Sequence, residues 1–85
     1  MIRTNDPVRA LAFCAQATRL GLGLEVTAEG GGVYALCTRD WDAGAALWWL
    51  LETDGPRFAP RLPTMADVQE AMDQRHAMEA GGAGD

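Results

Sequence analysis

The sequence contains no serine and no lysine, and it has a single histidine among its 85 residues. Without serine there is no serine nucleophile, and without lysine there is neither a Schiff-base lysine nor a phosphate-loop lysine. The two cysteines, Cys14 and Cys37, match neither a Cys-x-x-Cys redox pair nor a zinc-binding spacing. We therefore expect a protein that is not an enzyme, with no catalytic residue, no metal and no cofactor.

Positive charge is also scarce. Seven arginines face twelve acidic residues, which gives a net charge of -5 at pH 7. Affinity for phosphate backbones comes mainly from cations, so direct nucleic-acid binding is disfavoured. The longest apolar run, residues 43–51, falls well short of the ~20 residues that span a bilayer. Residues 1–6 carry no secretory-type apolar stretch, so we expect a cytoplasmic protein with reduced thiols and no membrane contact.

The length allows one small domain. We expect a single α+β domain over residues 1–80 and a flexible, glycine-rich tail over residues 81–85. Its predicted order is helix, β-hairpin, helix, proline-rich connector and helix, with the helices packed mainly on one face of the hairpin.

The first predicted helix covers residues 7–20. Asp6 is a good N-cap, Pro7 suits the first helical position, and Gly21 ends the helix. On a helical wheel, one narrow arc is expected to face water: Arg9, Ala12, Gln16 and Arg19. The opposite arc is expected to face the core: Leu11, Phe13, Cys14, Ala17 and Leu20.

A β-hairpin is predicted next. Apolar and polar residues alternate over residues 22–29. Glu29 and the three glycines that follow it suit a turn, and residues 33–38 form the return strand. The return strand is apolar on both faces, so we expect it to be covered on both sides, at least in part.

Two further helices complete the prediction. The second covers residues 40–53, with Thr38 or Asp40 as its cap. Prolines keep residues 55–63 non-helical, with room for a short edge strand near Phe58. Thr64 caps a third helix that runs to about Ala80, and Asp67 takes the place of the glutamate in a capping box.

The second helix holds the best candidate for a binding site, because it is apolar almost all the way round. One arc suits the core: Ala43, Ala46, Leu47, Leu50 and Leu51. A second arc, which we name the tryptophan surface, comprises Trp41, Ala45, Trp48 and Trp49 with the acidic residues Asp42 and Glu52. Either the connector and third helix cover this surface, with Phe58, Leu62, Met65 and Met72 as a lid, or it is exposed to bind a protein.

Acidic residues on the third helix form a second candidate surface, which comprises Asp67, Glu70 and Asp73. They either keep the chain soluble or steer it toward a basic partner. His76 lies on the apolar stripe of the same helix. We therefore expect a partly buried side chain that either packs against its neighbours or interacts favourably with the helix dipole. The glycines at 30–32 join two strands, and are therefore poor candidates for a phosphate loop.

These observations favour a non-enzymatic, acidic protein-binding module that regulates or inhibits a partner protein. The partner is expected to be basic and to handle nucleic acids. Size and charge alone make the chain analogous to inhibitors encoded by phages and mobile elements. The alternative is a homodimeric assembly protein with the tryptophan surface as its interface. A third hypothesis is weak nucleotide or nucleic-acid binding through Arg9, Gln16 and Arg19.

Overall fold

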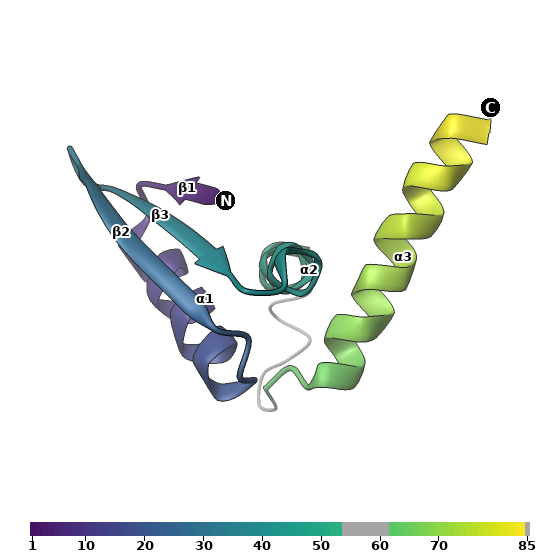
Figure 1. Cartoon of the computed structure of the whole chain (residues 1–85), viewed down its shortest axis with the longest axis horizontal. Helices are drawn as coiled ribbons and strands as arrows, with labels where there is room; N and C mark the ends of the chain where they lie inside the picture. Colours follow the sequence, from purple (N-terminus) through teal and green to yellow (C-terminus); the bar gives the residue numbers. More distant parts are fainter. Residues whose placement is uncertain (54–61, 85) are drawn as a thin grey trace.

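A computed structural model describes residues 1–53 and 62–84, and it confirms a small α+β domain (Figure 1). A three-stranded antiparallel sheet has the strand order β1-β3-β2 and is accompanied by three helices. The elements in chain order are β1 (Ile2–Thr4), α1 (Pro7–Arg19), β2 (Leu24–Gly30), β3 (Val33–Thr38), α2 (Trp41–Thr53) and α3 (Met65–Gly84).

The caps of α1 are those that the sequence predicts. The Asp6 Oδ1 atom accepts hydrogen bonds from the backbone N–H groups of Val8 and Arg9 at 3.0 and 3.2 Å. These bonds satisfy donors that have no partner within the helix. At the other end Gly21 adopts a φ of 71°, a left-handed conformation that costs glycine little. The helix therefore begins and ends where local chemistry dictates.

The glycine turn of the hairpin is also confirmed. Gly31 and Gly32 both have positive φ, which gives the turn a twist that suits two antiparallel strands. The sequence analysis missed a third strand, β1, which pairs with β3 so that Ile2 lies opposite Leu36. Because β1 has only three residues, it carries too little alternation to be recognised from sequence. Its presence makes β3 the central strand of the sheet.

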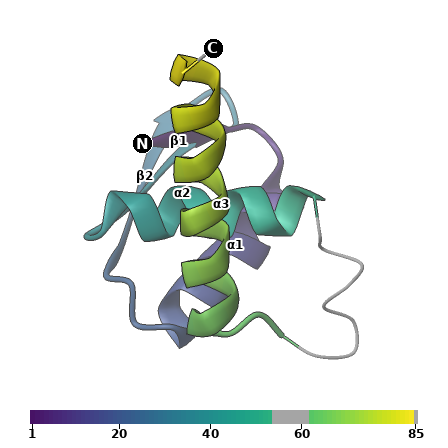
Figure 2. The same cartoon turned by 90° about the vertical axis from the view of Figure 1, so that its right-hand side faces the viewer.

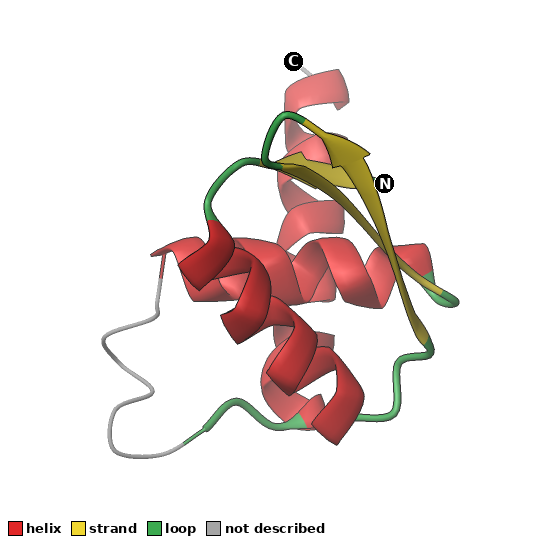
Figure 3. Ribbon diagram, turned by 90° about the vertical axis from the view of Figure 1, so that its left-hand side faces the viewer, coloured by secondary structure: helices red, strands yellow, loops and turns green. Residues whose placement is uncertain are grey.

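The core lies between α1, α2 and one side of the sheet. Side chains that are at most 7 % exposed come from every layer: Ala10, Phe13, Ala17, Leu22, Leu36, Ala43, Ala46, Leu47, Leu50, Val68 and Ala71. The predicted inner arc of α2 is confirmed, with Leu51 half-buried against this cluster. Figure 3 shows α1 in the foreground, with α2 behind it and the sheet above.

Asp40 precedes α2 as its cap, and α3 packs across α2. The Asp40 Oδ1 atom accepts a hydrogen bond from the Ala43 N–H at 3.2 Å, so Asp40 is the cap. The predicted capping box of α3 forms, because Asp67 Oδ2 accepts from the Thr64 N–H at 2.7 Å while Thr64 Oγ1 accepts from the Asp67 N–H at 3.3 Å. Helix α3 runs across α2 at a steep angle (Figure 2), and its buried contacts come from Val68 and Ala71.

Several boundaries differ from the sequence prediction. Leu11 was expected in the core but is 70 % exposed, because α1 turns Ala10 and Phe13 toward the other helices. Helix α3 continues past Ala80 to Gly84, while the flexibility predicted for the tail stays a prediction. The edge strand predicted near Phe58 lies outside the described residues.

Gly44 lies where α2 approaches β3 closely, and this generates a prediction. A Cβ atom at Gly44 would overlap the Oγ1 atom of Thr38, a side chain that is 4 % exposed and donates a hydrogen bond to the Asp40 carbonyl oxygen at 2.6 Å. We expect Gly44→Ala to lower the free energy of unfolding by about 1–3 kcal/mol, measured by urea denaturation. Alanine ordinarily stabilises a helix interior relative to glycine by about 1 kcal/mol. A decrease in the free energy of unfolding would therefore indicate the overlap with Thr38.

The control is the same substitution made in a Thr38→Ala background. Removing the hydroxyl and methyl groups relieves the overlap, so Gly44→Ala should cost less there than in the wild type. An equal cost in both backgrounds would contradict the close approach.

Candidate functional site

The three tryptophans of α2 lie in different environments. Trp48 is half-buried and makes an edge-to-face contact with Phe13, with ring centroids 5.5 Å apart and an interplanar angle of 72°. Trp49 is half-buried against the core, whereas Trp41 is 40 % exposed. The exposure of the indoles therefore differs within the tryptophan surface: Trp41 is exposed, whereas Trp48 and Trp49 pack against the core.

Arg9 covers the outer face of Trp48. Its guanidinium carbon lies 3.9 Å from the centre of the indole ring, and its Nη2 atom is 2.8 Å from Glu52 Oε2. A cation over an indole face is attractive, and the ion pair fixes the guanidinium there. The helical periodicity predicted that Arg9 faces water, which is wrong: the residue is half-buried and contacts Trp48 and Glu52 of α2. Arg19 is engaged as well, since it donates to Gln16 Oε1 and to the Pro63 carbonyl oxygen.

The other acidic residue of the tryptophan surface lies beside α3. The Asp42 Oδ2 atom is 3.7 Å from His76 Nε2, and more than half of each side chain is exposed. His76 was predicted to be partly buried. The structure corrects this, because α3 crosses α2 steeply and the buried side chains among residues 65–79 are Val68 and Ala71, one to two turns before His76.

The lid that the sequence offered as an alternative, Phe58, Leu62, Met65 and Met72, stays a prediction. Leu62 is 53 % exposed and Met65 is 45 % exposed, while Met72 packs against the core. Phe58 lies outside the described residues. Trp48 is covered by Arg9 and Phe13 from α1.

The second acidic surface divides into two kinds of residue. Asp67 is half-buried and engaged in the cap of α3. Glu70 and Asp73 are exposed, and each accepts a hydrogen bond from a glutamine side chain, Gln74 at 3.4 Å and Gln69 at 3.1 Å. Two of the three predicted carboxylates therefore remain on the surface.

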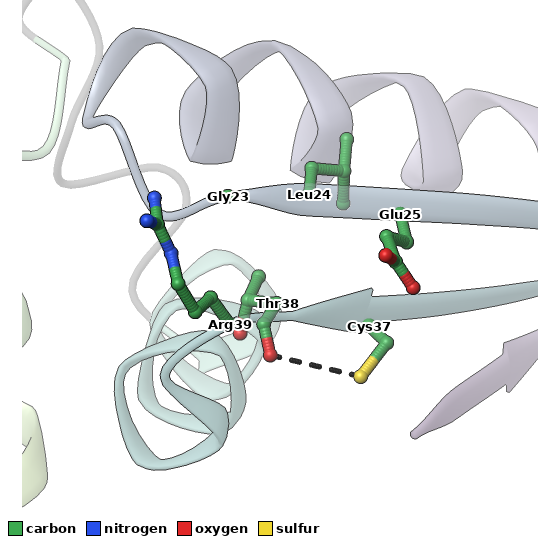
Figure 4. Close-up of a pocket in the computed structure, with 6 residues that line it drawn as sticks. All are labelled: Gly23, Leu24, Glu25, Cys37, Thr38 and Arg39. Atoms are coloured by element: carbon green, nitrogen blue, oxygen red, sulfur yellow. Dashed lines mark hydrogen bonds between the residues drawn. The ribbon is translucent and has the colours of Figure 1, made fainter.

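The depressions on the described surface include three of different character. An open one of about 500 Å³ adjoins Trp48 and Glu52, and its other lining residues are Arg3, Thr4, Asn5, Arg9 and Val33. An apolar groove of about 220 Å³ lies between α1 and the sheet and is lined by Pro7, Ala10, Leu11, Cys14, Val26, Tyr34 and Leu36. The third, of about 490 Å³, is at the open end of the hairpin (Figure 4). No sequence pattern indicated the first two, because each joins residues from separate elements, whereas the third lies on the predicted hairpin.

The hairpin depression contains a free thiol. Figure 4 shows Leu24 pointing toward α1, while Glu25 and Cys37 point away from it. The Cys37 thiol lies 3.6 Å from the Thr38 carbonyl oxygen, and both cysteines of the chain are free. Cys14 lines the apolar groove instead, and burial raises the pKa of its thiol.

The described residues contain no cluster of three or more histidine, cysteine or acidic side chains able to hold a metal ion. No helix in the described ranges reaches the length and hydropathy of a membrane-spanning segment. Models of known families, curated proteins and solved structures all fail to match the chain.

The graded burial of the tryptophans predicts unequal roles in stability. We expect Trp48→Ala to lower the free energy of unfolding by about 3 kcal/mol, because it removes the contacts with Phe13 and Arg9. Trp41→Ala should change it by less than about 1 kcal/mol, since a large part of this side chain already faces water. Chemical denaturation of both variants tests the difference, and equal losses would refute it.

The two thiols should differ in reactivity. Because the thiolate is the reactive form, a raised pKa leaves less of it on Cys14 at neutral pH. We expect iodoacetamide to modify Cys37 before Cys14, and modification of Cys14 to accelerate as the pH rises. Cys14→Ala and Cys37→Ala variants assign each rate by mass spectrometry. Faster reaction of Cys14 at pH 7 would contradict the prediction.

Proposed function

We propose that this protein is a non-enzymatic protein-binding module and that the tryptophan surface is its contact site. The observation that carries the proposal is the 40 % exposure of Trp41 beside the half-exposed Ala45, Trp48 and Trp49. Tryptophan offers a large contact area at low conformational cost and is enriched where binding energy concentrates in interfaces.

The buried side of this surface favours tight binding. Phe13 and Arg9 hold Trp48 in one orientation, and the core holds Trp49. A partner that meets fixed rings pays less entropy than one that must order mobile side chains. The contact site is therefore organised before the partner arrives.

The charges around the surface favour a basic partner. Asp42 and Glu52 lie at opposite ends of α2 and are exposed. Two copies of α2 packed parallel would bring Asp42 against Asp42, and antiparallel packing would bring Asp42 toward Glu52. Parallel packing opposes like charges, which disfavours self-association in that arrangement. In antiparallel packing, Arg9 balances part of the charge of Glu52. A foreign partner with arginine or lysine residues at the rim suits this surface better, and inhibition or regulation of such a partner is the role that we propose.

Affinity capture from the native host tests the proposal. We expect Trp41→Ala to weaken capture of a specific protein at least about tenfold, as a hot-spot residue does, while leaving the fold intact by circular dichroism. Leu62→Ala is the matched control, because Leu62 is also an exposed apolar residue but lies outside the tryptophan surface. A partner retained equally by all three proteins would refute the site.

A charge variant tests the nature of the partner. Asp42→Asn combined with Glu52→Gln should slow association at low ionic strength and reduce its dependence on salt. Surface plasmon resonance with the captured partner measures both quantities. An unchanged association rate would show that the carboxylates do not steer binding.

A further inference from the structure

The free edge of the sheet at β2 is the longest unpaired strand of the described structure. With the order β1-β3-β2, no strand formed by residues 1–53 or 62–84 lies along one side of β2, and every residue of β2 after Leu24 is exposed. Natural edge strands are commonly protected by charged side chains, proline, bulges or short length. Residues 24–30 contain no lysine or proline, and their protection is limited to Glu25, Glu29 and a bulge between Ala28 and Gly30, whereas the opposite edge, β1, is only three residues long. This edge is open to pairing with another strand.

The hydrogen bonds of the hairpin identify which backbone groups are available. The Arg39 N–H donates to the Gly23 carbonyl oxygen at 3.0 Å, next to the pair Leu24 and Thr38. In an antiparallel ladder, hydrogen-bonded and non-bonded pairs alternate. Glu25 and Thr27 therefore direct their N–H and C=O groups toward β3. The corresponding groups of Leu24, Val26 and Ala28 point outward.

An apolar groove adjoins this edge. Val26 is 50 % exposed and lines the groove between α1 and the sheet, together with Leu11, which is 70 % exposed. Val8, one turn before Leu11 on α1, is 76 % exposed. Unpaired backbone groups and uncovered apolar side chains thus meet at Val26.

We propose that two copies of this chain pair antiparallel through β2, with the two-fold axis at Val26. In an antiparallel pair, the side chains of two opposite residues lie on the same face of the sheet. The two-fold axis must therefore pair one residue of β2 with the same residue of the second copy. An axis at Thr27 would place Glu25 opposite Glu29 of the second copy, which is unfavourable. An axis at Val26 places Glu25 opposite Thr27 and Leu24 opposite Ala28.

This register uses all the outward backbone groups identified above. Val26 faces Val26 of the second copy as a hydrogen-bonded pair, flanked by two pairs of Leu24 with Ala28. Two bonds for each pair give about six backbone hydrogen bonds. The two valine side chains bring the two apolar grooves together, which removes exposed area on Val26 and Leu11 from water.

The charges at the ends of β2 are complementary in the same register. Glu29 of one copy comes opposite Gly23 of the other, and the Arg39 guanidinium lies against Gly23 (Figure 4). Glu29 already pairs with Arg3 of its own chain at 2.9 Å, so Arg39 would add a second cation. This complementarity favours a second copy over an unrelated strand. No residue of α2 lines the groove, so each copy keeps its tryptophan surface.

The oligomeric state tests the proposal. At about 100 μM we expect light scattering to give twice the 9.1 kDa of one chain. Val26→Lys should raise the dissociation constant at least about tenfold, because it opposes two like charges at the axis. Thr27→Lys is the matched control on the same strand. It places lysine opposite Glu25 of the second copy, so the dimer should persist or tighten.

Hydrogen exchange on the wild type provides a test that needs no variant. The amides of Leu24, Val26 and Ala28 should gain protection as concentration rises, whereas those of Glu25 and Thr27 are protected at every concentration. A monomeric wild type, a Val26→Lys variant that stays dimeric while folded, or unprotected outward amides would each overturn the proposal. Dissociation by Thr27→Lys would overturn the axis at Val26.

Discussion

The burial of α2 is the constraint on which the rest of the structure depends. This helix is apolar almost all round, and the chain has few other elements with which to cover it. Phe13 and Leu36 share one buried cluster with Leu47 of α2, and Val68 and Ala71 of α3 belong to the same cluster. Because α1 and α3 approach from different directions, residues 1–53 and 62–84 leave Trp41 of α2 exposed. That geometry, more than any single residue, produces the tryptophan surface.

Arg9 shows how one residue links stability to the proposed function. Its guanidinium lies over Trp48 and pairs with Glu52, so it shields an indole that the core covers only in part. The same contacts fix the two side chains in the orientation that a partner would meet. Trp48 belongs to the core as much as to the surface, and Trp41 carries the larger exposed share.

The free edge of β2 is a separate consequence of the small size of the domain. Three strands cannot close on themselves, so one long edge remains where α1 covers the sheet incompletely. Pairing of two copies there would leave the tryptophan surfaces unobstructed. A dimer of this kind would offer a partner two contact sites at once, which increases binding strength through effective concentration when the geometry permits.

The sequence by itself determined the features that depend on neighbouring residues. The Asp6 and Thr64 caps, the Gly31–Gly32 turn and the inner arc of α2 all follow from local chemistry and periodicity. Tertiary structure alone decided the remainder. The pairing of β1 with β3, the contact of Arg9 with Trp48 and the exposure of Leu11 each join or separate residues that are distant in the chain. Local propensity cannot specify such contacts, because they depend on how the helices cross. They also depend on which surfaces stay uncovered when a domain has few helices and strands.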